Sequence, residues 1–110
     1  HKEYRRQRQM CIRDSNHIAQ QMDSAVIYGL SAALYGEITL DKGRVQQSNF
    51  HDYSALRMDA CPAIETHIVP SAEHPEGMGE PGTPTVAPAL ASALFALTGQ
   101  RLRALPLKLA

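Results

Sequence analysis

The chain has 110 residues, of which 44% are hydrophobic, and its 11 Lys and Arg side chains are balanced by 11 Asp and Glu side chains. This length suits one small domain or a piece of a larger one, and the hydrophobic content argues against wholesale disorder. The zero net charge excludes a generally basic nucleic-acid binder, and two cysteines exclude a disulfide-dense secreted scaffold. No membrane span is predicted, because a membrane-spanning helix needs about 20 apolar residues and the sequence has no apolar run of that length.

The neutral total conceals a basic N-terminus. Residues 1–15 carry five basic and two acidic side chains, so their net charge is +3 and that of the remaining chain is −3. Within this segment, RQMCIRDS resembles a translated sequencing-adapter remnant. We therefore expect residues 1–15 to be a non-native scar, with a disordered arm or a nucleic-acid contact as the alternatives.

A helix is the first element predicted beyond this segment. Asn16 is a candidate N-cap, and residues 17–35 carry small or apolar residues at steps of three and four. Gly36 is predicted to end the helix in the left-handed conformation. The predicted packing face consists of Ile18, Met22, Ala25, Gly29 and Ala32.

A β-hairpin is predicted next. Residues 37–40 alternate with period two, residues 41–43 form a turn in which Gly43 can take a positive φ, and residues 44–50 return as the second strand. Residues 51–62 are predicted to form a loop, in which residues 51–53 shape a turn through side-chain-to-backbone bonds. Residues 64–69 are predicted as a further strand.

The last third of the chain begins with a loop and continues as a helix. Residues 70–84 contain four prolines and three glycines, a density that forbids regular structure. A helix is predicted from near Thr85 to Gly99, with Pro88 in its first turn. Residues 101–107 are predicted as an edge strand. The predicted apolar stripe of the helix consists of Val86, Leu90, Ala93, Leu94 and Leu97.

This order of elements predicts an α+β fold in which two helices cover a small mixed sheet, made of the hairpin and further strands. Histidines 51, 67 and 74 match no tight metal-ligand spacing, so we expect no metal site formed by protein side chains. Cys61 is expected to be an inert thiol.

The loop sequence EGMGEPG over residues 76–82 carries the most informative chemistry. Gly77 and Gly79 allow the backbone to approach a ligand closely and to present N–H groups to it. Pro81 holds Glu80 in an extended conformation, so the loop presents one carboxylate as a general base requires. A Gly/Pro connection with a solvent-exposed glutamate is the alternative, because a lone Gly-x-Gly-Glu motif is weak.

Three segments, GMGEPGTP, VAPALASALFALTG and RLRALPL, resemble the C-terminal end of a molybdopterin-binding large subunit. The family is that of xanthine dehydrogenase and aldehyde oxidase, in particular its isoquinoline 1-oxidoreductase-like bacterial subgroup. The segments QMDSAVIYGLSAALYGEITLDKGRVQQSNFHDY and PAIETHIVPS extend the resemblance over residues 16–107. Glu76, Thr85 and Ser54 depart from the subgroup, which usually has glycine at the first position and proline at the other two.

The resemblance implies an oxidoreductase that hydroxylates an aldehyde or an N-heterocycle with water-derived oxygen. It implies a molybdenum-pterin cofactor, in the molybdopterin cytosine dinucleotide form, and 2Fe-2S clusters on a partner subunit. The position of the general base is Glu80. Cofactor-binding positions are Gln21, whose amide can donate to and accept from a pterin, and the loop residues Gly77, Met78 and Gly79.

The resemblance also implies that residues 16–110 are the C-terminal fragment of a larger molybdenum cofactor-binding domain. Its partners would be the remainder of its own large subunit, an iron–sulfur subunit and a small-molecule substrate, with no nucleic acid. We expect the fragment alone to be inactive, and its location to be the cytoplasm, with the periplasm as the alternative. A standalone, non-catalytic α+β binding or docking module is the rival interpretation.

Overall fold

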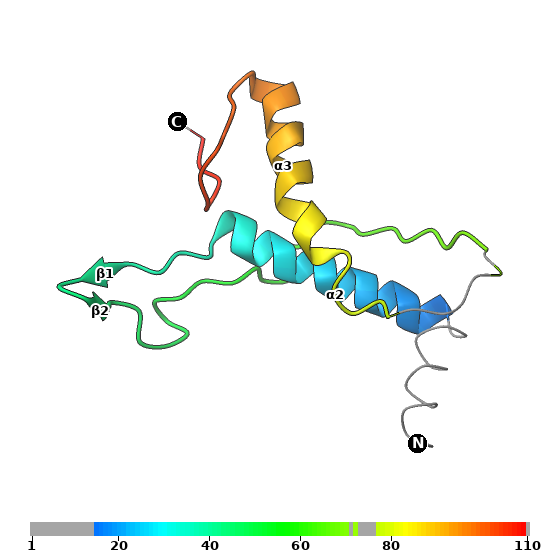
Figure 1. The fold of residues 1–110 in the computed structure, drawn as a ribbon, viewed down its shortest axis with the longest axis horizontal. Helices are drawn as coiled ribbons and strands as arrows, with labels where there is room; N and C mark the ends of the chain where they lie inside the picture. The colour runs from blue at the N-terminus through cyan, green and yellow to red at the C-terminus, as the bar shows by residue number, and fades with distance from the viewer. Residues whose placement is uncertain (1–14, 71, 73–76, 110) are drawn as a thin grey trace, which may run out of the picture.

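A computed structural model describes residues 15–70, 72 and 77–109 of the chain (Figure 1). Residues 1–14 of the suspected scar, which was predicted over residues 1–15, lie outside the described residues, as do His74 and Glu76. The described residues form two helices and one antiparallel hairpin, so the predicted α+β class is confirmed. In chain order the elements are α2 (Ser15–Leu34), β1 (Leu40–Asp41), β2 (Arg44–Val45) and α3 (Thr83–Thr98).

The first helix, α2, ends differently from the prediction. The N–H groups of Tyr35 and Gly36 both donate to the Ser31 carbonyl, at 3.0 and 2.9 Å. Gly36 does not take a positive φ, which the glycines of the described chain show only at Gly43 and Gly99. A Cβ at Gly36 would lie 3.1 Å from Ala32 Cα and 3.2 Å from its carbonyl oxygen. Glycine therefore allows a close approach to the last turn of α2, and the prediction of a left-handed cap was wrong.

The hairpin has the predicted turn and shorter strands. Lys42 and Gly43 take φ values of 48° and 79°, and Leu40 pairs with Val45. Two successive positive φ values are typical of a type I′ turn. Beyond the strands, the Thr39 N–H donates to the Gln47 side-chain oxygen at 2.9 Å. Regular strand pairing stops at Thr39 because its N–H donates to the Gln47 side-chain oxygen and not to a backbone carbonyl of the other strand.

Two further predicted strands are not formed. Residues 64–69 have no regular structure, because no described strand pairs with them. Residues 101–107 do not form an edge strand either, since the Leu107 N–H donates to the Ala33 carbonyl of α2 at 2.7 Å. Of the predicted mixed sheet, the described residues form only the two-stranded hairpin, and the further strands that the helices were predicted to cover are absent from them. Within the described ranges, α2 and α3 contact each other, and the hairpin projects away from both (Figure 1).

The second helix, α3, begins two residues earlier than predicted. Pro84 occupies its first turn, where the missing N–H leaves no hydrogen bond unmade, and Pro88 lies inside the helix. The predicted end is confirmed, because Gly99 takes a φ of 74° and its N–H donates to the Phe95 carbonyl at 2.8 Å.

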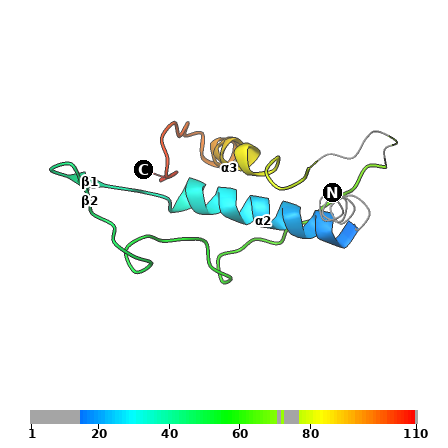
Figure 2. The same cartoon turned by 60° about the horizontal axis from the view of Figure 1, so that its bottom comes forward.

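Small residues let α2 and α3 cross at close range (Figures 1 and 2). A Cβ added at Gly29 would lie 2.8 Å from Val86 Cβ and 3.0 Å from the Thr83 carbonyl oxygen. The Thr83 hydroxyl donates to the Ala25 carbonyl at 3.4 Å. The first turns of α3 are therefore seated on the middle of α2.

The hydrophobic core is confined to this crossing and to the chain end that returns to it. Its buried side chains are Ala25, Leu30, Ala33, Val86 and Leu107. The predicted faces hold only in part. Ala33 replaces Ala32 on the buried face of α2, and Ala93 and Leu97 of α3 are exposed because only the first turns of α3 contact α2.

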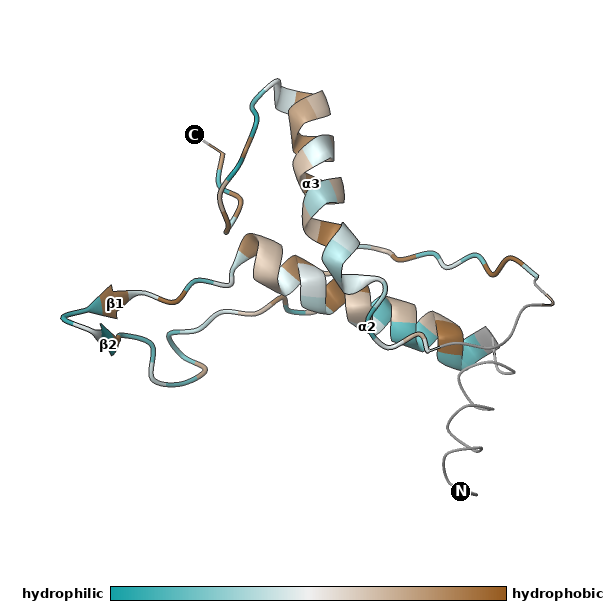
Figure 3. Ribbon diagram, in the orientation of Figure 1, coloured by the Kyte–Doolittle hydropathy of each residue, from teal (hydrophilic) through white to brown (hydrophobic). Residues whose placement is uncertain are grey.

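Much apolar surface faces solvent, since Phe50, Met58 and Leu97 are each more than 80% exposed. Figure 3 shows hydrophobic residues, in brown, along α3. The chain exposes 9412 Å² of surface. A compact monomer of its mass, 12.1 kDa, exposes about 6000 Å². The fold is therefore open rather than closed around one core. No helix within the described segments is long and apolar enough to cross a membrane.

Candidate functional site

The loop over residues 77–82 is anchored to α2 at its C-terminal end. A Cβ added at Gly82 would lie 3.0 Å from Ala25 Cβ and 3.3 Å from Met22 Cε. The Thr83 N–H donates to the Glu80 carbonyl at 3.1 Å, so a tight turn leads from the loop into α3. The position of the Glu80 backbone is thus set by the helix crossing.

Gln21 lies one residue before Met22 on α2, and its side chain is exposed. Because Met22 contacts Gly82, the turn of α2 that carries Gln21 lies beside the end of the loop that carries Glu80. The structure therefore brings together two predicted site segments that are far apart in the sequence. No hydrogen bond joins the Gln21 and Glu80 side chains.

The loop itself is open to a ligand. Glu80 is exposed, and its carboxylate makes no hydrogen bond or ion pair with any described residue. A Cβ added at Gly77 or Gly79 would meet no atom of the described residues within 4 Å. Met78 between them is half-buried. The loop therefore offers an available carboxylate on a backbone that no described side chain blocks.

This donor set fits a polar, multi-contact cofactor better than a bare metal ion. Backbone N–H groups, one amide and one carboxylate can all hydrogen-bond to a pterin and its substituents. In the described part of the chain, no group of three or more His, Cys, Asp or Glu side chains could hold a metal ion. A metal ion bound at this site would therefore need most of its ligands from a cofactor, because the described side chains do not supply them.

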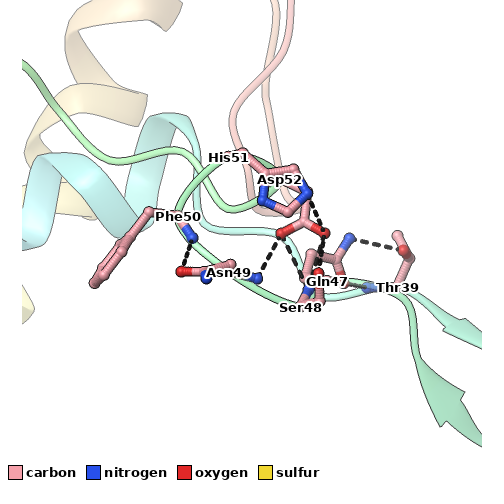
Figure 4. A network of polar contacts seen from close by, with 7 residues as sticks. All are labelled: Thr39, Gln47, Ser48, Asn49, Phe50, His51 and Asp52. Carbon is pink, nitrogen blue, oxygen red and sulfur yellow. Dashed lines mark hydrogen bonds and ion pairs between the residues drawn. The ribbon is translucent and has the colours of Figure 1, made fainter.

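A second polar cluster holds the loop that follows the hairpin (Figure 4). The Asp52 carboxylate accepts the Ser48 N–H at 2.9 Å and the Asn49 N–H at 2.9 Å. These backbone hydrogen bonds, that from Asn49 first, hold the pKa of Asp52 below its ordinary value of 3.8. The predicted turn at residues 51–53 is thus confirmed as a side-chain-to-backbone structure, and it holds no catalytic geometry.

Sequence reasoning missed the residues that position the loop. Met22 and Gly82 contact each other and join Gln21 to Glu80, but Met22 was assigned only to a packing face. The signal available in the sequence was Gly82, the third glycine of the predicted loop. It stands directly before a helix, at a position where the predicted loop gave no conformational reason for a glycine.

No family model matches the chain. Among curated proteins, the chain is similar to the beta chain of isoquinoline 1-oxidoreductase from Brevundimonas diminuta, at 38% identity over 89% of the chain and 13% of that protein. A membrane-bound aldehyde dehydrogenase (pyrroloquinoline-quinone) of Gluconacetobacter polyoxogenes is 35% identical over 86% of the chain and 12% of that protein. A nicotinate dehydrogenase subunit of Pseudomonas putida is 31% identical over 82% of the chain and 8% of that protein.

The chain spans about an eighth or less of the length of these relatives. All three names are those of oxidoreductases, and two denote subunits. Isoquinoline and nicotinate are N-heterocycles, so the names are consistent with the aldehyde and N-heterocycle chemistry of the xanthine dehydrogenase family. One name specifies pyrroloquinoline quinone and none specifies molybdenum.

Proposed function

We propose that this chain is part of the large subunit of a molybdenum hydroxylase that oxidises an aldehyde or an N-heterocycle, with Glu80 as the general base. The observation that carries the proposal is the contact of Gly82 with Met22 and Ala25. That contact holds an open loop, whose carboxylate has no partner among the described residues, beside the turn of α2 that carries Gln21. The similarity to three oxidoreductases supports the same interpretation.

Each predicted site residue has a separate task in this proposal. The Gly77 and Gly79 N–H groups face the ligand, and the Gln21 amide hydrogen-bonds the pterin. Met78, half-buried between the glycines, anchors the loop. The molybdenum-pterin group, when bound, supplies the two-electron redox centre that the described side chains lack.

Glu80 handles the proton. Its carboxylate accepts a proton from the water-derived oxygen as that oxygen is transferred to the substrate carbon. An exposed carboxylate that no described residue engages is free to take this proton and to release it to solvent afterwards. Pro81 restricts the Glu80 backbone, which keeps the carboxylate presented from the loop.

The rest of the enzyme lies outside this chain in our proposal. Residues 16–110 are a piece of the cofactor-binding domain, and the remainder of the large subunit covers part of the exposed apolar surface of α2 and α3. Electrons leave through 2Fe-2S clusters on a partner subunit, and the cofactor takes the cytosine dinucleotide form. The chain alone is inactive, and the enzyme is placed in the cytoplasm.

The test is Glu80→Gln in the complete large subunit, purified with its iron–sulfur partner. We expect kcat to fall by about 10²–10⁴-fold, because general-base catalysis contributes a factor of that size. Molybdenum content, measured on the same samples, should not change. The control is Glu65→Gln, which removes another exposed carboxylate, one that pairs with His67 and lies outside the candidate site residues, and it should retain full turnover. Unchanged kcat in Glu80→Gln would show that Glu80 is not the base.

A further inference from the structure

A small pocket lies at the opposite end of α3 from the candidate site. Its volume is about 170 Å³, and it lies between one face of α3 and the extended segment over residues 101–103. Phe95 lies about 18 Å further along the helix axis than Thr83, at a rise of 1.5 Å per residue. The pocket is therefore separate from the Glu80 loop. It is lined by Ala91, Ser92, Phe95, Arg101, Leu102 and Arg103.

Two arginines, Arg101 and Arg103, line this pocket. They are separated by one residue, Leu102, which is half-buried while both arginines are exposed. The Arg101 guanidinium carbon lies 4.0 Å from the centroid of the Phe95 ring. This stacking holds the guanidinium in place while leaving its N–H groups available.

Acidic groups of the described chain do not neutralise this pair. The sequence contains no Asp or Glu after Glu80, although three basic side chains follow it. The third, Lys108, has a partner, because its Nζ lies 3.1 Å from Glu37 Oε2. Neither Arg101 nor Arg103 forms an ion pair with a described residue. Two like charges at the rim of one pocket repel each other, and an anion bound between them would relieve that repulsion.

We propose that this pocket binds the dianionic phosphoryl group of a small molecule. Two guanidinium groups match a dianion in charge, and their planar N–H forks match the oxygen spacing of a phosphoryl group. The Ser92 hydroxyl makes no hydrogen bond within the described chain and adds a third donor. Leu102 and the helix face provide an apolar wall for the organic part of a phosphate monoester.

The proposal is tested on the complete 110-residue chain, labelled with ¹⁵N and titrated at low ionic strength. The probes are inorganic phosphate, phenyl phosphate and acetate, and the readout is the amide shifts of Ser92, Phe95 and Leu102. We expect saturable binding of both phosphates and at least about tenfold weaker binding of acetate. Tighter binding of phenyl phosphate than of inorganic phosphate would identify an organic monoester as the ligand. The reverse order would identify free phosphate.

Arg103→Gln is the decisive variant, because Arg103 makes no hydrogen bond or ion pair with a described residue that its loss would break. We expect this variant to weaken phosphate binding by roughly tenfold. Arg57→Gln is the matched control, with the same change of charge at an exposed position outside the pocket. Arg101→Lys, which keeps the charge and loses the planar stacking, should weaken binding less. The proposal would be overturned if the phosphates caused no saturable amide shifts, or if Arg57→Gln weakened phosphate binding as much as Arg103→Gln. The proposed function would stand in either case.

Discussion

The helix crossing and the hairpin arm, residues 36–62, are held together in different ways. At the crossing, Gly29 and Gly82 let α2 and α3 approach until an added Cβ would collide. In the arm, side chains hydrogen-bond to backbone only a few residues away, as Asp52 does with Ser48 and Asn49. The crossing depends on residues far apart in the sequence, whereas the turns of the arm depend on near neighbours. The arm is joined to the rest of the chain by the Leu56 N–H, which donates to the Ser31 hydroxyl at 3.0 Å, and by the Glu37–Lys108 ion pair. The loop that carries Glu80 belongs to the first kind, so its position depends on long-range packing.

The largest effect is expected from breaking the crossing. Gly29→Val should lower the free energy of unfolding by about 2 kcal/mol, because the new side chain overpacks against Val86 and the Thr83 carbonyl. The measurement is denaturant unfolding followed by circular dichroism. Gly79→Ala is the control, since its Cβ would meet no described atom within 4 Å. Equal stability of the two variants would mean that the crossing is not closely packed.

A smaller and local effect is expected in the arm. Gly43→Ala should destabilise the hairpin by about 1 kcal/mol, because a Cβ disfavours a φ of 79°. The hairpin does not contact α2 or α3, so helix signals in an NMR spectrum should stay unchanged while those of β1 and β2 shift. Loss of helix signals would contradict the independence of the two regions.

The smallest effect is expected from pH. Hydrogen bonds from Asn49 and Ser48 lower the pKa of Asp52, so they stabilise the loop above the ordinary pKa of 3.8. This stabilisation is lost as the pH falls below 3.8 through the lowered pKa of the folded state. The Ser48 and Asn49 amide shifts should follow this titration, and Asp52→Asn should abolish it. Persistence of the titration in Asp52→Asn would assign it to another group.

Local chemistry made part of this fold predictable. The type I′ turn at Lys42 and Gly43, the left-handed Gly99 and the Asp52 turn all depend on neighbouring residues, and the sequence indicates each of them. The strands at residues 64–69 and 101–107 were wrong, because alternation indicates an extended chain but does not supply a pairing partner.

The residues of the candidate site were proposed from the sequence and remain a prediction, whereas their arrangement could not be predicted from it. The Gly-Met-Gly-Glu sequence marked the loop, and a resemblance marked Gln21. Their proximity depends on Met22 and Gly82, whose contact across the crossing leaves no periodic pattern in the sequence. The Arg101 and Arg103 pocket was missed because the Arg-Leu-Arg alternation was assigned to a strand.

The most direct test of the account is the cofactor content of the complete enzyme purified from cells. Molybdenum is measured by mass spectrometry of the digested protein, and pyrroloquinoline quinone by its release on denaturation. The account predicts stoichiometric molybdenum with a pterin in both the wild-type enzyme and the Glu80→Gln variant, with turnover strongly reduced only in the variant. An active enzyme that holds the quinone and no molybdenum would contradict it.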